Sequence, residues 1–222
     1  MLPGPHNNPL MEALADYLKQ ATKDAQIKNY PRGQILLYKN DKPVDIMVVR
    51  KGIVKIFDTD ENDNEKILHL IKPLGVIPLA FFSGGKEKIH WCYSALTECE
   101  VSVIPYEDFY KLLDDNCDFA LQLMNWFSVE VHELLVRLSS LGKTNAEDKI
   151  KAALKFLAVN HSKKKKDSWV QVDFSVNHQL VADMTGVTRE RAAMIMKELA
   201  AHKIIRNPRQ NVLELNTAKL ID

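Results

Sequence analysis

Cysteine is scarce in this chain of 222 residues, and its three cysteines form no C-x-x-C pair. These residues are Cys92, Cys99 and Cys117. An odd number of cysteines without paired spacing argues against a disulfide scaffold, a zinc knuckle or a four-cysteine cluster. Apolar residues make up 46% of the chain, but no run approaches the roughly 18 residues that a membrane span needs. The sequence therefore predicts a soluble protein with no membrane partner.

A secretory signal is also missing. Residues 1–11 contain three prolines and no basic stretch followed by an apolar core, as such a signal requires. We therefore expect a cytoplasmic protein. A length of 222 residues suits two ordinary domains, each of which buries its own core.

Charge is divided unequally along the chain. Residues 1–144 contain 16 Lys and Arg against 20 Asp and Glu, whereas residues 145–222 contain 14 against 9. A basic C-terminal third suits a polyanion such as DNA, because phosphate neutralisation releases counterions. Four of these positive charges form the run 163–166, which is also typical of a solvated loop.

The first part of the chain combines one helix with many short strands. Apolar spacing predicts an amphipathic helix over residues 10–22. Short β-rich runs separated by polar turns follow at residues 35–38, 46–49, 53–57, 67–71 and 101–104. This rhythm is typical of an antiparallel sandwich or jelly roll. We predict a β-roll domain over residues 1–105.

Jelly rolls also carry metal-dependent enzymes, which need two or three histidines and a carboxylate on one metal. The seven histidines here are scattered without an H-x-H pair, at His6, His69, His90, His132, His161, His178 and His202. The pattern predicts no enzyme, no catalytic residue and no metal site.

Helical periodicity resumes at Tyr106 and continues to about Leu141. Apolar residues at steps of three and four form an a/d heptad seam with one polar interruption. A helix packed only on its own domain explains one face, but the second apolar face favours a partner subunit. We predict a dimer interface formed by Leu121, Met124, Phe127, Ser128, Val131, Leu135 and Leu138.

Residues 142–145 break this helix. Asn145 is the expected N-cap of a further helix over residues 146–159. The break is the predicted boundary between a helical region, residues 106–144, and a C-terminal domain, residues 145–222.

The strongest motif is in residues 178–197, which read HQLVADMTGVTRERAAMIMK. A helix-turn-helix needs a small residue where its helices cross, a turn residue tolerant of positive φ, and inward apolar positions on the second helix. These requirements are met by Ala182, Gly186, Val187, Ala192 and Ile195. A solvated helical hairpin is the alternative. Thr188 is the expected N-cap of the second helix.

The residues around this motif favour a winged domain. Residues 203–206 and 212–215 read as two strands joined by a turn at 207–210, and residues 169–174 supply a further strand. The order of β-roll, long helix and winged helix-turn-helix with T-R-E in its second helix resembles the cyclic-AMP receptor and fumarate–nitrate regulator (Crp/Fnr) family of bacterial transcription factors. The resemblance covers residues 30–215, nearly the whole chain.

The resemblance implies an α+β fold, with a cyclic-nucleotide-binding-like β-roll (double-stranded β-helix), a long dimerisation helix and a C-terminal winged helix-turn-helix. It implies a homodimer that binds a palindromic operator in double-stranded DNA and contacts RNA polymerase. The alternative is a regulatory or adaptor module that acts on a protein partner.

Carried onto this sequence, the resemblance implies that Arg189 reads guanine and Glu190 reads cytosine, while Gln179, Thr188 and His178 contact phosphates. The expected DNA-binding set is His178, Gln179, Thr188, Arg189, Glu190, Arg191, Ala193, Met194 and Lys197. The chain departs from the family at Met194, where a second arginine is common, and at Arg191, where an uncharged residue is common. We therefore expect an altered half-site, with Met194 against a thymine methyl group.

The family's cyclic-nucleotide binders hold the phosphate with a Gly-Glu pair and an Arg-Ser pair. Here Gly75 is kept, Val76-Ile77 occupies the neighbourhood of the glutamate, and Ile89-His90 takes the place of the Arg-Ser pair. Cyclic AMP is therefore disfavoured and no cofactor is expected. The candidate effector pocket comprises Gly75, Val76, Ile77, Leu79, Ser83, Ile89, His90, Leu134 and Leu135. The pocket either takes an apolar or gaseous effector or is filled by side chains.

Two further hypotheses concern what this segment binds. His90 and Cys92 are two residues apart and both can ligate haem iron. Residues 83–86 can form a small anion nest or a simple hairpin turn. An iron–sulfur sensor is excluded, because residues 1–30 contain no cysteine.

Overall fold

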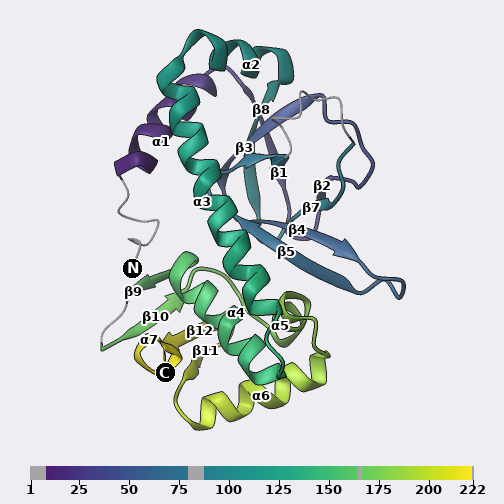
Figure 1. Cartoon of the computed structure of the whole chain (residues 1–222), viewed down its shortest axis with the longest axis vertical. Coiled ribbons are helices and arrows are strands. Elements are labelled where there is room, and N and C mark those ends of the chain that lie inside the picture. Colours follow the sequence, from purple (N-terminus) through teal and green to yellow (C-terminus); the bar gives the residue numbers. More distant parts are fainter. Residues whose placement is uncertain (1–8, 80–87, 165–166, 222) are drawn as a thin grey trace. The chain divides into compact units, whose positions relative to one another are not determined.

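The computed structural model describes residues 9–79, 88–164 and 167–221 (Figure 1). The chain divides into two compact units. The first comprises Met1–Asp58 and Leu68–His132, and the second comprises Thr59–Ile67 and Glu133–Asp222. Two elements, strand β5 (Glu65–Ile71) and helix α3 (Cys117–Leu141), run without interruption through these boundaries.

The first unit contains an antiparallel roll built from two four-stranded sheets, with the orders β1-β8-β3-β6 and β2-β7-β4-β5. Besides β5, the strands are β1 (Gln26–Tyr30), β2 (Ile35–Leu37), β3 (Asp45–Lys51), β4 (Val54–Thr59), β6 (Val76–Ile77), β7 (Cys92–Ala95) and β8 (Cys99–Pro105). The predicted α+β fold with an N-terminal jelly roll is confirmed. The expectation missed β1, β6 and β7, because these short strands lack an apolar run long enough to be recognised.

Side chains from both sheets fill the interior of the roll. A single cluster includes Met47, Val49, Ile77, Ile89 and Tyr93. The buried Tyr93 hydroxyl accepts a hydrogen bond from the Leu79 N–H over 3.3 Å. Burial raises the pKa of Tyr93 to about 12, so this phenol is neutral at physiological pH.

A second cluster in this unit joins the helices to one sheet. Leu14 and Leu18 of α1 (Pro9–Ala21) pack with Ile46, Phe109 and Phe119. Helix α1 agrees with the predicted segment. Its leucines share one face because they are four residues apart.

The expected continuous helix from Tyr106 to Leu141 is wrong in one respect. Helix α2 (Tyr106–Asp115) ends at Asn116, whose backbone is extended, and α3 begins at Cys117. The Asn116 side chain accepts a hydrogen bond from the Phe119 N–H over 3.0 Å. Asparagine at this position satisfies a free donor of the new helix, which favours a helix start over continuation.

The second unit contains a winged helical domain. Its sheet has the order β11-β12-β10-β9. After α3 the elements are α4 (Ala146–Asn160), β9 (Ser162–Lys164), β10 (Trp169–Val172), α5 (His178–Thr185), α6 (Arg189–Ala201), β11 (Ile205–Arg209), β12 (Val212–Asn216) and α7 (Thr217–Ile221). The Asn145 side chain caps α4 as predicted, accepting from the Asp148 N–H over 2.7 Å. Strand β9 and helix α7 were not predicted.

Candidate nucleic-acid interface

Helices α5 and α6 form the predicted helix-turn-helix, and side chains define each of its ends. Asn177 caps α5 by accepting from the Leu180 N–H over 2.8 Å. Gly186 ends α5 in the left-handed conformation, with φ of 70°. Thr188 caps α6 by accepting from the Arg191 N–H over 3.2 Å. These caps explain why the turn lies between residues 185 and 189.

The two helices pack through small and apolar residues. Ala182, Ala192 and Ile195 are 0–3% exposed, and Val187 is half-buried. Alanine at the crossing allows the backbones to approach closely, and this spacing fixes α6 on α5. Most residues on the outward face of α6 are therefore polar, with Met194 as an exception.

The outward face carries most of the predicted DNA-binding residues. Arg189, Glu190 and Arg191 are exposed in the first turn of α6, and Lys197 is exposed further along. Ala193 between them is half-buried. Helix α6 thus presents two arginines and one carboxylate at its N-terminal end, where reading helices contact base edges.

Two further candidates lie at the start of α5. His178 and Gln179 are exposed in its first turn. The Gln179 amide donates to Asp183 on the same helix over 2.7 Å. His178 and Gln179 are therefore at a helix N-terminus, where backbone N–H groups favour phosphate.

Arg191 lies near a thioether and a carboxylate. Met194 is 43% exposed, and its sulfur lies 3.9 Å from Arg191 Nη1. Glu147 of α4 has its pKa held below the usual range by a hydrogen bond and charge from Lys151, with smaller contributions from His202 and Arg191. Arg191 therefore has a carboxylate in its electrostatic field.

The wing adds residues that the sequence interpretation did not assign. Arg206 pairs with Glu214 over 2.6 Å, and its guanidinium lies 4.1 Å from the ring centroid of Trp169. Both contacts fix the base of the wing. Arg209 and Gln210 are exposed at its tip. The strand–turn–strand pattern located this wing, but nothing in that pattern assigned a role to the exposed residues at its tip.

Comparison with known proteins supports this geometry. A model of the cyclic nucleotide-binding domain matches residues 27–116, and a model of the Crp-like helix-turn-helix domain matches residues 148–222. The chain belongs to the Crp/Fnr family. It is a DNA-binding transcription regulator of that type.

The relatives of this Crp/Fnr regulator match over most of their length. The chain is 26% identical over 207 residues to the HTH-type transcriptional regulator ArcR of Staphylococcus haemolyticus, covering 89% of each chain. It is 26% identical over 183 residues to the cAMP-activated global transcriptional regulator CRP of Salmonella typhimurium, covering 81% of this chain and 84% of that one.

A cyclic nucleotide-binding domain containing protein from Listeria monocytogenes has the same fold, with a TM-score of 0.77. The two share 16% sequence identity, and the match covers 95% of this chain and 99% of that one. At this identity the likeness concerns the fold.

The candidate effector residues of this Crp/Fnr regulator have different environments. Ile77 and Ile89 are buried in the cluster that fills the roll, whereas Val76 is buried in the cluster that joins the helices to one sheet. Leu79 is half-buried. The Gly75 N–H donates to the Lys72 carbonyl oxygen over 3.0 Å. A side chain at Gly75 would lie 2.2 Å from an Ile71 carbon, so close packing requires glycine here.

The remaining effector candidates are less buried. His90 is exposed before strand β7, with its ring edge against Trp91 at 5.9 Å between centroids. Leu134 is half-buried and Leu135 is 60% exposed on α3. Ser83 and the possible anion nest lie outside the described residues. Sequence reasoning therefore grouped residues that the structure divides between interior and surface.

The predicted dimer residues form a stripe on α3, which we call the α3 stripe: Leu121, Met124, Ser128, Val131, Leu135 and Leu138. Its apolar members are 39–67% exposed, and Ser128 is also exposed. The predicted neighbour Phe127 is half-buried against the first unit's own core.

Among the described residues, no helix has the length and apolar character needed to cross a bilayer.

Proposed function

We propose that this regulator acts as a homodimer on a palindromic operator, with helix α6 of each subunit in successive major grooves. One observation supports the proposal: the same chain has exposed polar residues on α6 that can contact bases and an exposed apolar stripe on α3. A two-fold dimer presents two α6 helices about one turn of DNA apart.

The partner on the α3 stripe is a second copy of the chain. The stripe follows heptad spacing, so it is self-complementary when two α3 helices pack together around a two-fold axis. Exposed apolar patches of this kind mark interfaces. Ser128 interrupts the apolar seam, and a polar residue there favours one register over others.

Sequence is read from the first turn of α6. Arg189 donates two hydrogen bonds to guanine O6 and N7, and Glu190 accepts from the cytosine amino group. Thr188 uses its oxygen to cap the helix, which leaves its hydroxyl hydrogen to donate to a phosphate. His178, Gln179 and Lys197 provide further phosphate contacts.

Met194 alters the preferred half-site. Its thioether accepts hydrogen bonds only weakly and donates none, so it cannot replace an arginine opposite guanine. Exposed on α6 and near Arg191, it packs instead against a thymine methyl group. The operator therefore differs from the family's usual half-site at this base pair.

Cyclic AMP is not the effector in this proposal. The Gly75 N–H is used inside its own turn, and the apolar residues Val76 and Ile77 occupy the neighbourhood of the family's glutamate. A cyclic phosphate requires free backbone donors and a bidentate cation. The roll is filled by its own side chains or takes an apolar effector, and the DNA-bound dimer acts on RNA polymerase in the cytoplasm.

The test is selection of binding sites from random duplexes by the purified full-length protein, followed by titrations at several salt concentrations. We expect a palindrome, with affinity that falls as salt rises because phosphate contacts release counterions. Recovery of the family's usual half-site unchanged would contradict the role of Met194. No binding to any duplex at low salt would favour the protein-adaptor alternative.

A further inference from the structure

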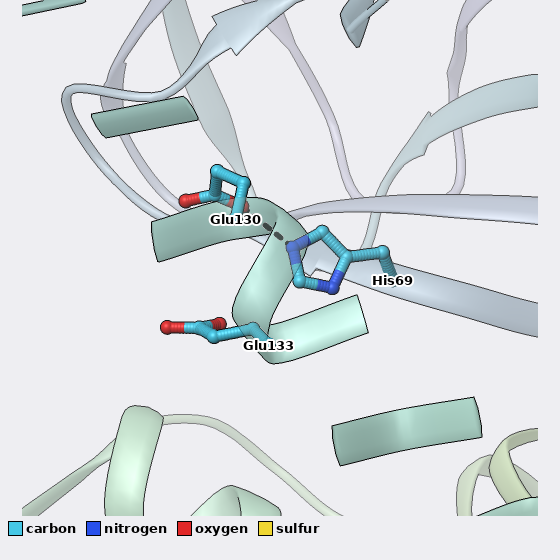
Figure 2. A group of neighbouring side chains, drawn as sticks. All are labelled: His69, Glu130 and Glu133. Carbon is cyan, nitrogen blue, oxygen red and sulfur yellow. Dashed lines mark hydrogen bonds and ion pairs between the residues drawn. The ribbon is translucent and has the colours of Figure 1, made fainter. Parts of the chain in front are cut away.

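Three side chains of types that commonly bind metals lie together outside the helix-turn-helix. His69 comes from strand β5, and Glu130 and Glu133 come from successive turns of helix α3 (Figure 2). One ligand atom from each residue lies within 4.8 Å of those from the other two. We call these three residues the His–Glu–Glu group.

The secondary structure explains how the group forms. Residues three apart on a helix share a face, so the uninterrupted α3 carries Glu130 and Glu133 on the same side. His69 reaches this side from β5, and its Nε2 lies 2.6 Å from Glu130 Oε2. The group was not predicted, because its histidine is 61 positions from its first carboxylate.

Burial imposes a desolvation free-energy cost on the charges of the group. His69, Glu130 and Glu133 are only 1%, 3% and 5% exposed. Two carboxylates on adjacent turns repel each other, and both lose hydration. A divalent cation ligated by both carboxylates offsets their mutual repulsion and their loss of hydration.

The donor set selects the class of ion. One imidazole nitrogen and two carboxylate oxygens suit Zn²⁺, Mn²⁺ or Fe²⁺, whereas Ca²⁺ and Mg²⁺ prefer oxygen alone. Metal–ligand bonds of about 2.0–2.2 Å place neighbouring ligand atoms roughly 3–4 Å apart. Small rotations of the two glutamate side chains bring the present 4.8 Å spread into that range.

We propose that the His–Glu–Glu group binds one first-row divalent transition-metal ion. The ion joins β5 to α3 by coordinating residues of both, and water completes its coordination. This site is additional to the DNA-binding function and is independent of whether an effector enters the roll.

The test uses full-length protein stripped with chelator and then titrated with Zn²⁺, with metal content measured by mass spectrometry. We expect one ion per chain and a rise in melting temperature of roughly 5–10 °C at a Zn²⁺ concentration 100-fold above Kd. Glu133→Gln keeps the side-chain volume but removes the anionic ligand, so it abolishes most of this rise. His69→Gln has the same effect.

The controls are Glu147→Gln and His90→Gln, which alter an exposed carboxylate and an exposed histidine. Both retain one ion per chain if the proposal is right. If His69→Gln does not fold, the visible spectrum of bound Co²⁺ in the wild type and in Glu133→Gln replaces that comparison, and a changed spectrum supports the site. Absence of stoichiometric binding by folded wild-type protein, or unchanged binding by Glu133→Gln, overturns the proposal.

Discussion

Arg189 is the first residue of α6, and its guanidinium is exposed. This position directs its planar fork toward base edges when α6 enters the major groove. We expect Arg189→Ala to lose about 1–3 kcal/mol of DNA-binding free energy, concentrated at one base pair. The measurement is fluorescence anisotropy on the selected operator and on duplexes with each base pair changed in turn.

Lys197→Ala is the matched control for Arg189→Ala. Lys197 is also exposed on α6. Because it is a proposed phosphate contact, its loss should weaken binding to all duplexes about equally and lower the salt slope by about one. If Arg189→Ala instead weakens every duplex by the same factor, then Arg189 contacts phosphate and does not read a base.

Single residues were predictable where their role is local. Asn145, Thr188 and Gly186 were identified because a cap or a positive φ depends on neighbours in the sequence. Buried charged residues such as Glu130 and Arg137 were not identified. Their burial depends on what packs over them, and the periodicity of apolar residues contains no information about polar residues on an inner face.

Helix α5 ends at Gly186, which has φ of 70°. A side chain there meets nothing within 4 Å, so the cost of Gly186→Ala is backbone strain alone. We expect a loss of about 1–2 kcal/mol in the free energy of unfolding, measured by urea denaturation. Gly142→Ala is the control, because Gly142 lacks positive φ and its added carbon makes only ordinary contacts, the nearest at 3.5 Å. A loss at Gly142 equal to that at Gly186 would contradict the strain argument.

The α3 stripe is the proposed contact between two copies of helix α3. Leu135→Glu places a charge in the proposed seam between two α3 helices, so we expect dissociation to monomers by analytical ultracentrifugation, with weaker operator binding. Val136→Glu makes a similar change at a residue that is 44% exposed but off the seam. It should remain dimeric. A dimer that survives Leu135→Glu would place the interface elsewhere.

Elements were predictable in proportion to their length and regularity. Helices α1, α4, α5 and α6 emerged from periodicity and caps. The break at Asn116 was missed because the apolar spacing continues on both sides of it. Strand β6 has two residues, too few for a period, and it forms because β3 offers backbone partners at Met47 and Val48.

At the scale of the whole chain, the order of roll, long helix and winged domain was predictable from the change of period along the sequence. The candidate effector pocket was not. Grouping His90 and Leu135 with Ile77 required knowledge of which residues face inward, and the structure exposes the first two. Alignment to a family pattern gives positions in a fold, but exposure is decided by neighbours distant in sequence.

Arg137 of α3 contacts two segments of the second unit that are far apart in the sequence. Its Nη2 donates to the carbonyl oxygens of Ile67 and Met184, each over 2.9 Å, and its guanidinium lies 5.5 Å from the ring centroid of Phe156. Burial lowers the pKa of Arg137 to about 10, so the charge remains at neutral pH but is held at a desolvation cost. The two charge-assisted hydrogen bonds offset that cost.

We expect Arg137→Met to destabilise the protein. The change leaves two buried carbonyl groups without their donor, at about 1–3 kcal/mol each, and relief of the buried charge returns part of this, so the net loss is about 1–3 kcal/mol. Urea denaturation measures it. Arg50→Met is the control, because the Arg50 and Glu100 side chains of its ion pair are 43% and 36% exposed and such pairs contribute under about 1 kcal/mol. Equal losses in both variants would mean that the Arg137 carbonyl contacts contribute no more than a surface ion pair.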